Sequence, residues 1–226
     1  MHQHSAGMIS LLGDHNNFVF IGESGCGKSE LALNAATLLA QKAEAHLFDL
    51  DQTKVLYRSR DARETVESAN LTFHYAQQVY DSPTVASGVR SNLLRKDCHT
   101  VIDVGGNDTG ARMIGQFAKA INSTDTKVFY VVNPYRPWSR SILEIDETMS
   151  AILGVSHLQK ISVIVNPNLG SQTTAEVFMA GLARAQEMLS PYVKVEGACV
   201  QDIIYEDIVT RMDIPLVSLS LHLHHE

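Results

Sequence analysis

The chain has 226 residues, of which 45% are hydrophobic, and its formal net charge is −7 at pH 7. This length favours one domain with a sizeable core, and we expect a single domain over residues 1–226 with flexible ends at 1–16 and 219–226. The acidic charge argues against nucleic acid as a direct partner, because binding a polyanion requires a basic surface. No apolar run approaches the roughly 20 residues of a membrane-spanning helix.

The number and spacing of the cysteines indicate whether the protein belongs to a reducing or an oxidising compartment. Cys26, Cys98 and Cys199 lie far apart, and the sequence contains neither a CxxC nor a CxC pair. An odd number of distant cysteines argues against a disulfide framework. We therefore expect a reduced protein of the cytoplasm.

Short apolar runs alternate along the chain with longer segments of helical periodicity. The apolar runs predict β-strands at residues 17–21, 45–50, 100–104, 127–132, 161–165, 193–200 and 214–217. Helical spacing predicts helices at 28–41, from about 85 to 96, over the apolar positions from 113 to 121, from a capping box at Ser141 and Glu144 to about 153, and at 178–189. Residues 52–82 are polar and predict no clear element. Strands that are apolar on both faces and separated by helices indicate a doubly wound α/β fold, whose mainly parallel sheet has helices on both faces.

One segment carries a phosphate-binding motif. Residues 22–29, GESGCGKS, fit the P-loop pattern GxxxxGK[ST] in full, between a predicted strand and a predicted helix. The glycines allow the backbone N–H groups to face a phosphate, Lys28 places an ammonium near the β and γ oxygens, and the Ser29 hydroxyl coordinates Mg²⁺. The residues expected to contact the nucleotide here are Glu23, Ser24, Gly25, Cys26, Gly27, Lys28, Ser29 and Glu30.

A P-loop requires a further carboxylate at the end of a neighbouring strand. Asp103 follows the apolar run HTVI and is the candidate Mg²⁺ ligand, while Gly106 completes a DxxG pattern whose N–H could sense a γ-phosphate. Asp49 and Asp51 end another strand; Asp51 is the better candidate to orient water or to hold Mg²⁺, and Asp49 to support it. Purely structural roles remain open for these carboxylates, since Asp is common at strand ends and in turns.

The order of these motifs resembles a known class of protein. A P-loop followed by FDLDQ, VIDVGG, VVNP and VIVNPN over about residues 17–170 is similar to the MinD/ParA/CobQ-like (SIMIBI) P-loop NTPases. The resemblance implies that Asp51 works at the γ-phosphate, that Asp103 serves Mg²⁺, and that Asn166 contacts adenine. It also implies a possible homodimer. The signature lysine of the MinD and ParA branch is replaced by Glu23, so the chain lacks the residue that contacts the nucleotide across such dimers.

A second resemblance is local. The nine residues GESGCGKSE are similar to the P-loop of HPr kinase/phosphorylase, G-x-S-G-x-G-K-S-E. Two functions therefore stay open: an ATPase that switches its contact with a partner protein, and a phosphotransferase that acts on a small molecule or a protein side chain. Either one uses a nucleotide with Mg²⁺.

The segments that follow the predicted strands 127–132 and 161–165 bear on whether the nucleotide carries adenine or guanine. Neither Asn133-Pro-Tyr-Arg nor Asn166-Pro-Asn-Leu supplies the Asp of the NKxD motif that binds guanine, so ATP is favoured over GTP. The only tryptophan, Trp138, lies on the first of these segments and could stack on a base, contact a partner or simply pack. No arginine finger can be assigned; the candidates are Arg58, Arg60, Arg112, Arg136 and Arg140.

Overall fold

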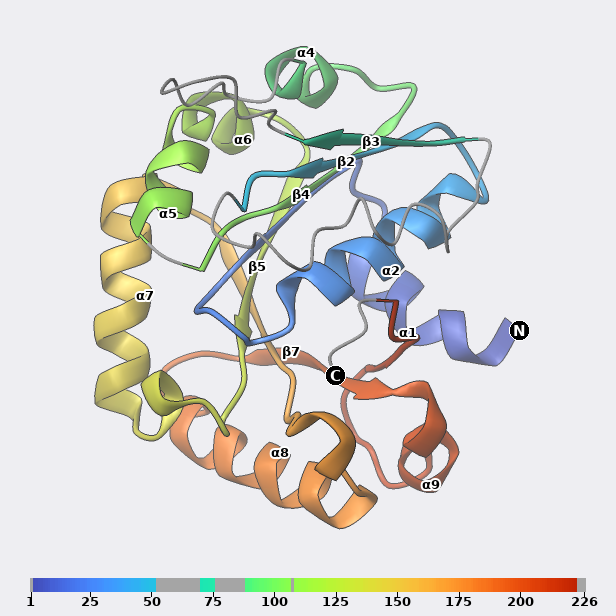
Figure 1. Ribbon diagram of the computed structural model, residues 1–226, viewed down its shortest axis with the longest axis vertical. Helices are drawn as coiled ribbons and strands as arrows, with labels where there is room; N and C mark the ends of the chain where they lie inside the picture. The colour runs from blue at the N-terminus through green and yellow to red at the C-terminus, as the bar shows by residue number, and fades with distance from the viewer. Residues whose placement is uncertain (1, 52–69, 76–87, 107, 223–226) are drawn as a thin grey trace.

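The computed structural model describes residues 2–51, 70–75, 88–106 and 108–222 (Figure 1). Within these ranges the chain forms one eight-stranded sheet in which all neighbouring strands are parallel, in the order β3-β2-β4-β1-β5-β6-β7-β8. The strands are β1 (Asn17–Ile21), β2 (Ala45–Asp49), β3 (Leu71–Tyr75), β4 (His99–Asp103), β5 (Thr126–Val132), β6 (Ile161–Val165), β7 (Val195–Gln201) and β8 (Leu216–Leu219). The predicted parallel α/β fold is confirmed.

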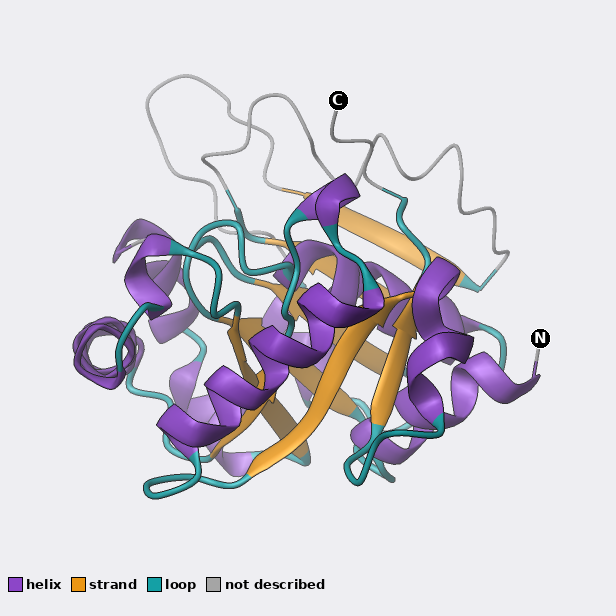
Figure 2. Ribbon diagram, turned by 90° about the horizontal axis from the view of Figure 1, so that it is seen from below, coloured by secondary structure: helices purple, strands orange, loops and turns teal. Residues whose placement is uncertain are grey.

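Helices cover both faces of this sheet (Figures 1 and 2). The helices are α1 (His2–Leu12), α2 (Lys28–Ala40), α4 (Val89–Leu93), α5 (Asp108–Gly115), α6 (Ala118–Ser123), α7 (Ile142–Ser156), α8 (Ala175–Leu189) and α9 (Tyr205–Val209). One core cluster joins the sheet to α1 and α2, and a second joins the opposite face to α4 through α9. Within the described ranges no helix combines the length and the apolarity needed to cross a membrane.

The order of the strands locates the ligand edge of the sheet. From β1 the chain crosses to β2, β3 and β4 on one side, and from β5 it continues to β8 on the other. The strand order therefore reverses beside β1, and in open α/β sheets ligands bind at such a point, beyond the carboxyl ends of the strands. The P-loop follows β1 directly, so it lies at this position.

Described residues at both ends of the chain, where flexible segments were expected, pack against the rest of the protein. Residues 2–12 form α1, and Leu11 and Leu12 are buried against the sheet. Gly7 permits this packing, because a Cβ there would lie on the carbonyl oxygen of Leu216 in β8. At the other end, the Ser220 N–H donates to Asn34 Oδ1 (3.0 Å), and Asn34 Nδ2 donates back to the Ser220 carbonyl (2.9 Å). Residues 223–226 lie outside the described residues.

The other predicted elements are close to those observed. The predicted strands are confirmed, with ends that differ by at most two residues, and the capping box at the start of α7 is present. The helix predicted over 113–121 is broken into α5 and α6 after Gly115, where a Cβ would lie 2.8 Å from the Val155 carbonyl of α7. Only the part of the predicted helix near 85–96 that starts at residue 88 lies within the described residues, and there it is the short α4.

Strand β3 was not predicted. It lies inside the polar stretch 52–82, most of which is outside the described residues, and it forms the edge of the sheet beside β2. A side-chain hydrogen bond adds to the strand pairing here, since His46 Nδ1 and His74 Nε2 are 2.9 Å apart. On its other side His46 Nε2 lies 3.1 Å from Glu44 Oε1, and the Arg95 guanidinium binds Glu44 Oε2 at 2.7 Å.

Candidate functional site

The P-loop curls between β1 and α2. Gly22, Gly25 and Gly27 have φ values of 137°, 74° and 99°, a region that side chains other than glycine rarely adopt. Gly27 is the N-cap of α2, so the positive end of the helix dipole faces the loop. This is the geometry that the GxxxxGK[ST] pattern predicts.

Lys28 is folded into the loop. Its side chain is only 2% exposed, and Nζ donates to the Glu23 carbonyl at 2.7 Å and lies 3.7 Å from Cys26 Sγ. A buried ammonium needs compensating partners, and here the backbone of the loop itself supplies one. Cys26 is 1% exposed and belongs to the core cluster below the loop.

The carboxylates lie at the ends of β2 and β4. Asp49 and Asp103 are paired neighbours on these parallel strands, and the strand alternation directs both toward the face that α2 covers. Asp49 Oδ1 accepts the N–H of Asp51 at 2.9 Å, which is the supporting role predicted for it. The side chain of Asp51 lies close to Gly105: a Cβ added at Gly105 would be 3.1 Å from the Oδ1 atom of Asp51. All three carboxylates are buried at the edge that the P-loop occupies.

The DxxG segment touches the P-loop. A Cβ at Gly106 would lie 2.4 Å from the Ser24 nitrogen and 2.7 Å from the Glu23 carbonyl carbon. The backbone after β4 is therefore in direct contact with the backbone of the loop. Movement of either segment toward the other is therefore blocked by main-chain atoms, because no side chain stands between them.

No three His, Cys, Asp or Glu side chains in the described ranges form a ready metal cage. Mg²⁺ does not need one, since it commonly takes one or two protein ligands and completes its shell with water and phosphate oxygens. Ser29 and Asp103, with Asp51 beside them, fit such a partial donor set. Their roles as Mg²⁺ ligands stay predictions.

Two predicted contact residues are engaged with the protein. Asn166, directly after β6, donates through Nδ2 to the Cys26 carbonyl at 2.9 Å, and within the described residues its buried Oδ1 has no hydrogen-bond partner. Glu30 follows Ser29 in the first turn of α2, but its carboxylate accepts the N–H of His222. The side chain of Glu30 is therefore directed to the C-terminal segment, whereas Asn166 lies against the P-loop.

Sequence reasoning did not place Arg136 and Trp138 at the P-loop. Arg136 Nε donates to the Gly25 carbonyl at 2.9 Å, and Trp138 Nε1 donates to the Ser24 carbonyl at 3.2 Å. The signal available in the sequence was their position after β5, the strand beside β1. Of the other candidate fingers, Arg112 and Arg140 are exposed, and Arg58 and Arg60 lie outside the described residues.

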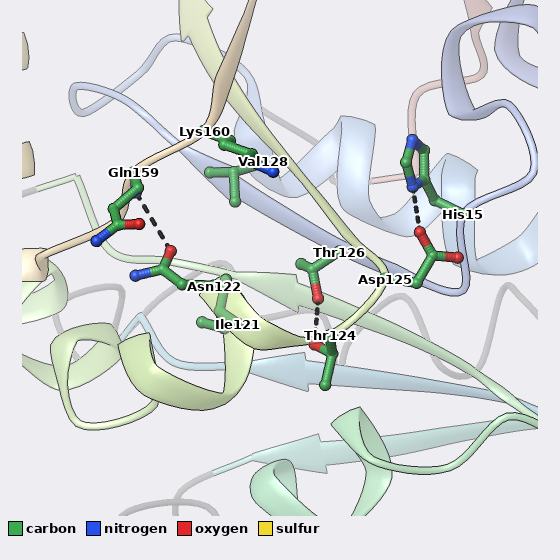
Figure 3. A pocket seen from close by; sticks show the side chains of 9 residues that line it. All are labelled: His15, Ile121, Asn122, Thr124, Asp125, Thr126, Val128, Gln159 and Lys160. Carbon is green, nitrogen blue, oxygen red and sulfur yellow. Dashed lines mark hydrogen bonds and ion pairs between the residues drawn. The ribbon is translucent and has the colours of Figure 1, made fainter.

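A pocket of about 170 Å³ opens at the opposite edge of the sheet (Figure 3). Its lining comes from segments at the amino ends of β1, β5 and β6, and it includes the His15–Asp125 pair at 2.6 Å and the hydroxyls of Thr124 and Thr126, 2.8 Å apart. Because it lies across the sheet from the P-loop, it takes no part in the site described above.

No protein-family model and no curated protein matches the chain. Solved structures do: a plasmid partition protein (BB_S35) from Borrelia burgdorferi B31 bound to AMPPNP has a TM-score of 0.52 and 15% identity, covering 88% of this chain and 90% of that one. The MinD cell division protein of Aquifex aeolicus has a TM-score of 0.46 and 17% identity, covering 88% of this chain and 87% of that one. The likeness to the partition protein shows the fold: the two chains share a parallel α/β sheet with the same arrangement of elements over most of their length. The resemblance stated from the sequence is thus confirmed at the level of the fold.

Proposed function

We propose that the chain binds ATP with Mg²⁺, hydrolyses it, and uses the bound nucleotide to switch its contact with a partner protein. One observation carries the proposal: Lys28 and Ser29 of the P-loop lie with Asp51 and Asp103 at one edge of the sheet, and all four are buried. This set contains a cation for phosphate oxygens, two oxygen ligands for Mg²⁺ and a carboxylate for the attacking water.

The residues present fit a nucleotide. Glycines with positive φ leave room above the loop for phosphate oxygens, and α2 directs its amino end at the same point. Lys28 would hold the β and γ oxygens, Ser29 and Asp103 would hold Mg²⁺, and Asp51 would orient water toward the γ-phosphate. Bound Mg²⁺ supplies neutralisation of the charge on the phosphate oxygens.

The segment after β6 favours adenine as the base of the nucleotide. Asn166-Pro-Asn-Leu carries no Asp for guanine. Asn166 itself lies against the Cys26 carbonyl with its Oδ1 fully buried, so its side chain would have to turn to reach a base. The partition protein with the same fold was solved with AMPPNP, an analogue of ATP.

The contact of Gly106 with Ser24 favours a switch over a phosphotransferase. The DxxG segment leads into α5, which packs against α7, so a shift at the P-loop is passed to a helical face of the molecule. Conversion of a small local shift into movement of a packed element is the usual device of nucleotide switches.

Release of phosphate from ATP and from GTP, with and without Mg²⁺, tests the proposal. We expect Mg²⁺-dependent release that is faster with ATP, and Lys28→Ala should reduce it by at least about 100-fold, as removal of a transition-state contact does. The exposed Lys42→Ala is the matched control. If ADP forms only when an acceptor is phosphorylated, the protein is a phosphotransferase instead; if wild-type protein neither binds nor cleaves nucleotide, the proposal is wrong.

A further inference from the structure

The carbonyl groups of the P-loop are held by side chains at four consecutive residues. Each carbonyl from residue 23 to residue 26 accepts a hydrogen bond from a different side chain. The pairs are the Glu23 carbonyl with Lys28 Nζ (2.7 Å), Ser24 with Trp138 Nε1 (3.2 Å), Gly25 with Arg136 Nε (2.9 Å) and Cys26 with Asn166 Nδ2 (2.9 Å). Three of the four donors come from the segments after β5 and β6.

These carbonyl contacts also determine where the N–H groups of the loop point. In a trans peptide the C=O of one residue and the N–H of the next lie in one plane and point in opposite directions. No peptide bond in the described ranges is cis. The indole that holds the Ser24 carbonyl therefore turns the N–H of Gly25 away from Trp138, and the guanidinium that holds the Gly25 carbonyl turns the N–H of Cys26 away from Arg136.

For the Cys26 N–H, this direction is the inside of the loop. The Cys26 N–H points to the Glu23 carbonyl at 3.4 Å, the same oxygen that receives the Lys28 ammonium. Backbone N–H groups that converge beside this lysine are the donors with which a P-loop binds phosphate. Arg136, which holds the Gly25 carbonyl, thus sets the orientation of the Cys26 N–H, and Trp138, which holds the Ser24 carbonyl, turns the Gly25 N–H away from the indole.

The segment that carries Arg136 and Trp138 is itself fixed. Asn133 Nδ2 donates to the Asn168 carbonyl at 2.8 Å, and Asn133 Oδ1 accepts the N–H of Tyr135 at 3.1 Å. The Tyr135 hydroxyl donates to the Val177 carbonyl of α8 at 2.5 Å. Since the segment is held to the β6 side of the molecule, it can impose a conformation on the P-loop.

We propose that Arg136 and Trp138 are positioning residues that orient the P-loop amides for phosphate. The inference rests on the nucleotide binding proposed above and names residues that act through the backbone of Ser24 and Gly25. Neither side chain has to touch the nucleotide for this role. The loop after β5 then contributes to affinity by preorganisation, because amides that already point inward need no ordering when the phosphate binds.

Three variants separate this role from bulk packing and from charge. Trp138→Phe keeps one aromatic ring and removes the indole N–H together with the five-membered ring that carries it. Arg136→Gln places an amide nitrogen where the arginine Nε stands, without the charge, whereas Arg136→Ala removes donor and charge together. Affinities for ADP and a non-hydrolysable ATP analogue in Mg²⁺ are measured by titration calorimetry. Urea unfolding without nucleotide reports whether each variant is folded.

We expect Trp138→Phe to weaken both nucleotides about 3- to 10-fold, the effect of one hydrogen bond. Arg136→Ala should weaken them about 10-fold or more, because its donor is charged, and Arg136→Gln should recover most of that loss. Trp138 is the only tryptophan, so its fluorescence should respond to nucleotide in wild type and in Arg136→Gln. A purely structural role would change urea unfolding and leave the affinities of the folded protein unaltered.

The outcomes distinguish failure of the proposed nucleotide binding from failure of the positioning role. Wild-type protein that binds no nucleotide would refute the proposed function. Wild-type protein that binds nucleotide, with Trp138→Phe and Arg136→Ala equal to it, would overturn only the positioning role. Equal losses in Arg136→Gln and Arg136→Ala would show that Arg136 acts by charge. If Arg136→Ala does not fold, Trp138→Phe and Arg136→Gln still decide the question.

Discussion

Adding one methyl group at Gly106 tests how the segment after β4 is coupled to the P-loop. The Cβ of Gly106→Ala would lie 2.4 Å from the Ser24 nitrogen and 2.7 Å from the Glu23 carbonyl carbon, and ordinary contacts begin at 3.4 Å. The two backbones must therefore separate by 3.4 − 2.4 = 1.0 Å. Both contacts are with main-chain atoms, so no rotation of a side chain can relieve them.

The magnitude follows from what is displaced. A misplacement of about 1 Å can cost about 100-fold in the rate of a reaction, and we take the same factor, about 2.7 kcal/mol, for the affinity. We therefore expect Gly106→Ala to weaken nucleotide binding about 100-fold. Overpacking of this kind should also lower the free energy of unfolding by about 1–3 kcal/mol. The affinity for ADP should fall as much as that for ATP, because the clash is with the loop that we propose holds the β-phosphate.

Titration calorimetry with ADP and with a non-hydrolysable ATP analogue is the assay. Gly154→Ala is the matched control, since no atom lies within 4 Å of a Cβ built there. A Gly106→Ala protein that binds ADP normally and loses only ATP would refute the reasoning. That result would mean that Gly106 senses the γ-phosphate without a fixed contact to the loop.

Three further predictions concern stability, pH and metal. Asn34→Ala removes the amide that exchanges hydrogen bonds with Ser220 and should lower the free energy of unfolding in urea by about 1–3 kcal/mol; no change would mean that this end of the chain adds nothing to stability. Burial, and after it the neighbouring His46, lowers the pKa of His74 from 6.5. The unfolded chain therefore binds this proton more readily than the folded one, and stability should fall as the pH drops below 6.5. His74→Phe should lose less stability than wild type in urea unfolding between pH 6.5 and about pH 5, and an equal loss would contradict this. Asp103→Asn should weaken ATP binding about 10-fold or more in Mg²⁺ but not in EDTA, since it removes a metal ligand and a charge that repels phosphate; an equal loss in both would exclude a metal role.

The strands and the P-loop could be predicted because their signals are local. Strands β1, β5 and β6 are buried on both faces of a parallel sheet, which demands continuous apolar runs. The P-loop needs glycines, a lysine and a hydroxyl at fixed spacing along one short segment. Strand β3 gave no such signal: it lies at the edge of the sheet, and its sequence LTFHY includes two polar residues within a polar stretch.

The contacts that hold the P-loop could not be predicted, because they join distant parts of the chain. Arg136, Trp138 and Asn166 bind residues that lie 111, 114 and 140 positions earlier in the sequence. Each has an ordinary local explanation as a loop residue after a strand. Helix α1 was not predicted for a similar reason. Its apolar residues are buried by packing beside β8, which lies about 200 residues later in the sequence.

The P-loop is held in different ways on its two sides. On the β5 side the contacts are hydrogen bonds, and Trp138 is 38% exposed, so water can replace its N–H at a cost of about 1 kcal/mol. On the β4 side Gly106 meets the loop backbone directly, and such a contact cannot yield without movement of one segment. It follows that a change at Trp138 adjusts affinity by about one order of magnitude, whereas a change at Gly106 displaces the loop. In the proposed function, the contacts on the β5 side would therefore set the affinity for phosphate, and the contact on the β4 side would transmit the movement caused by its binding.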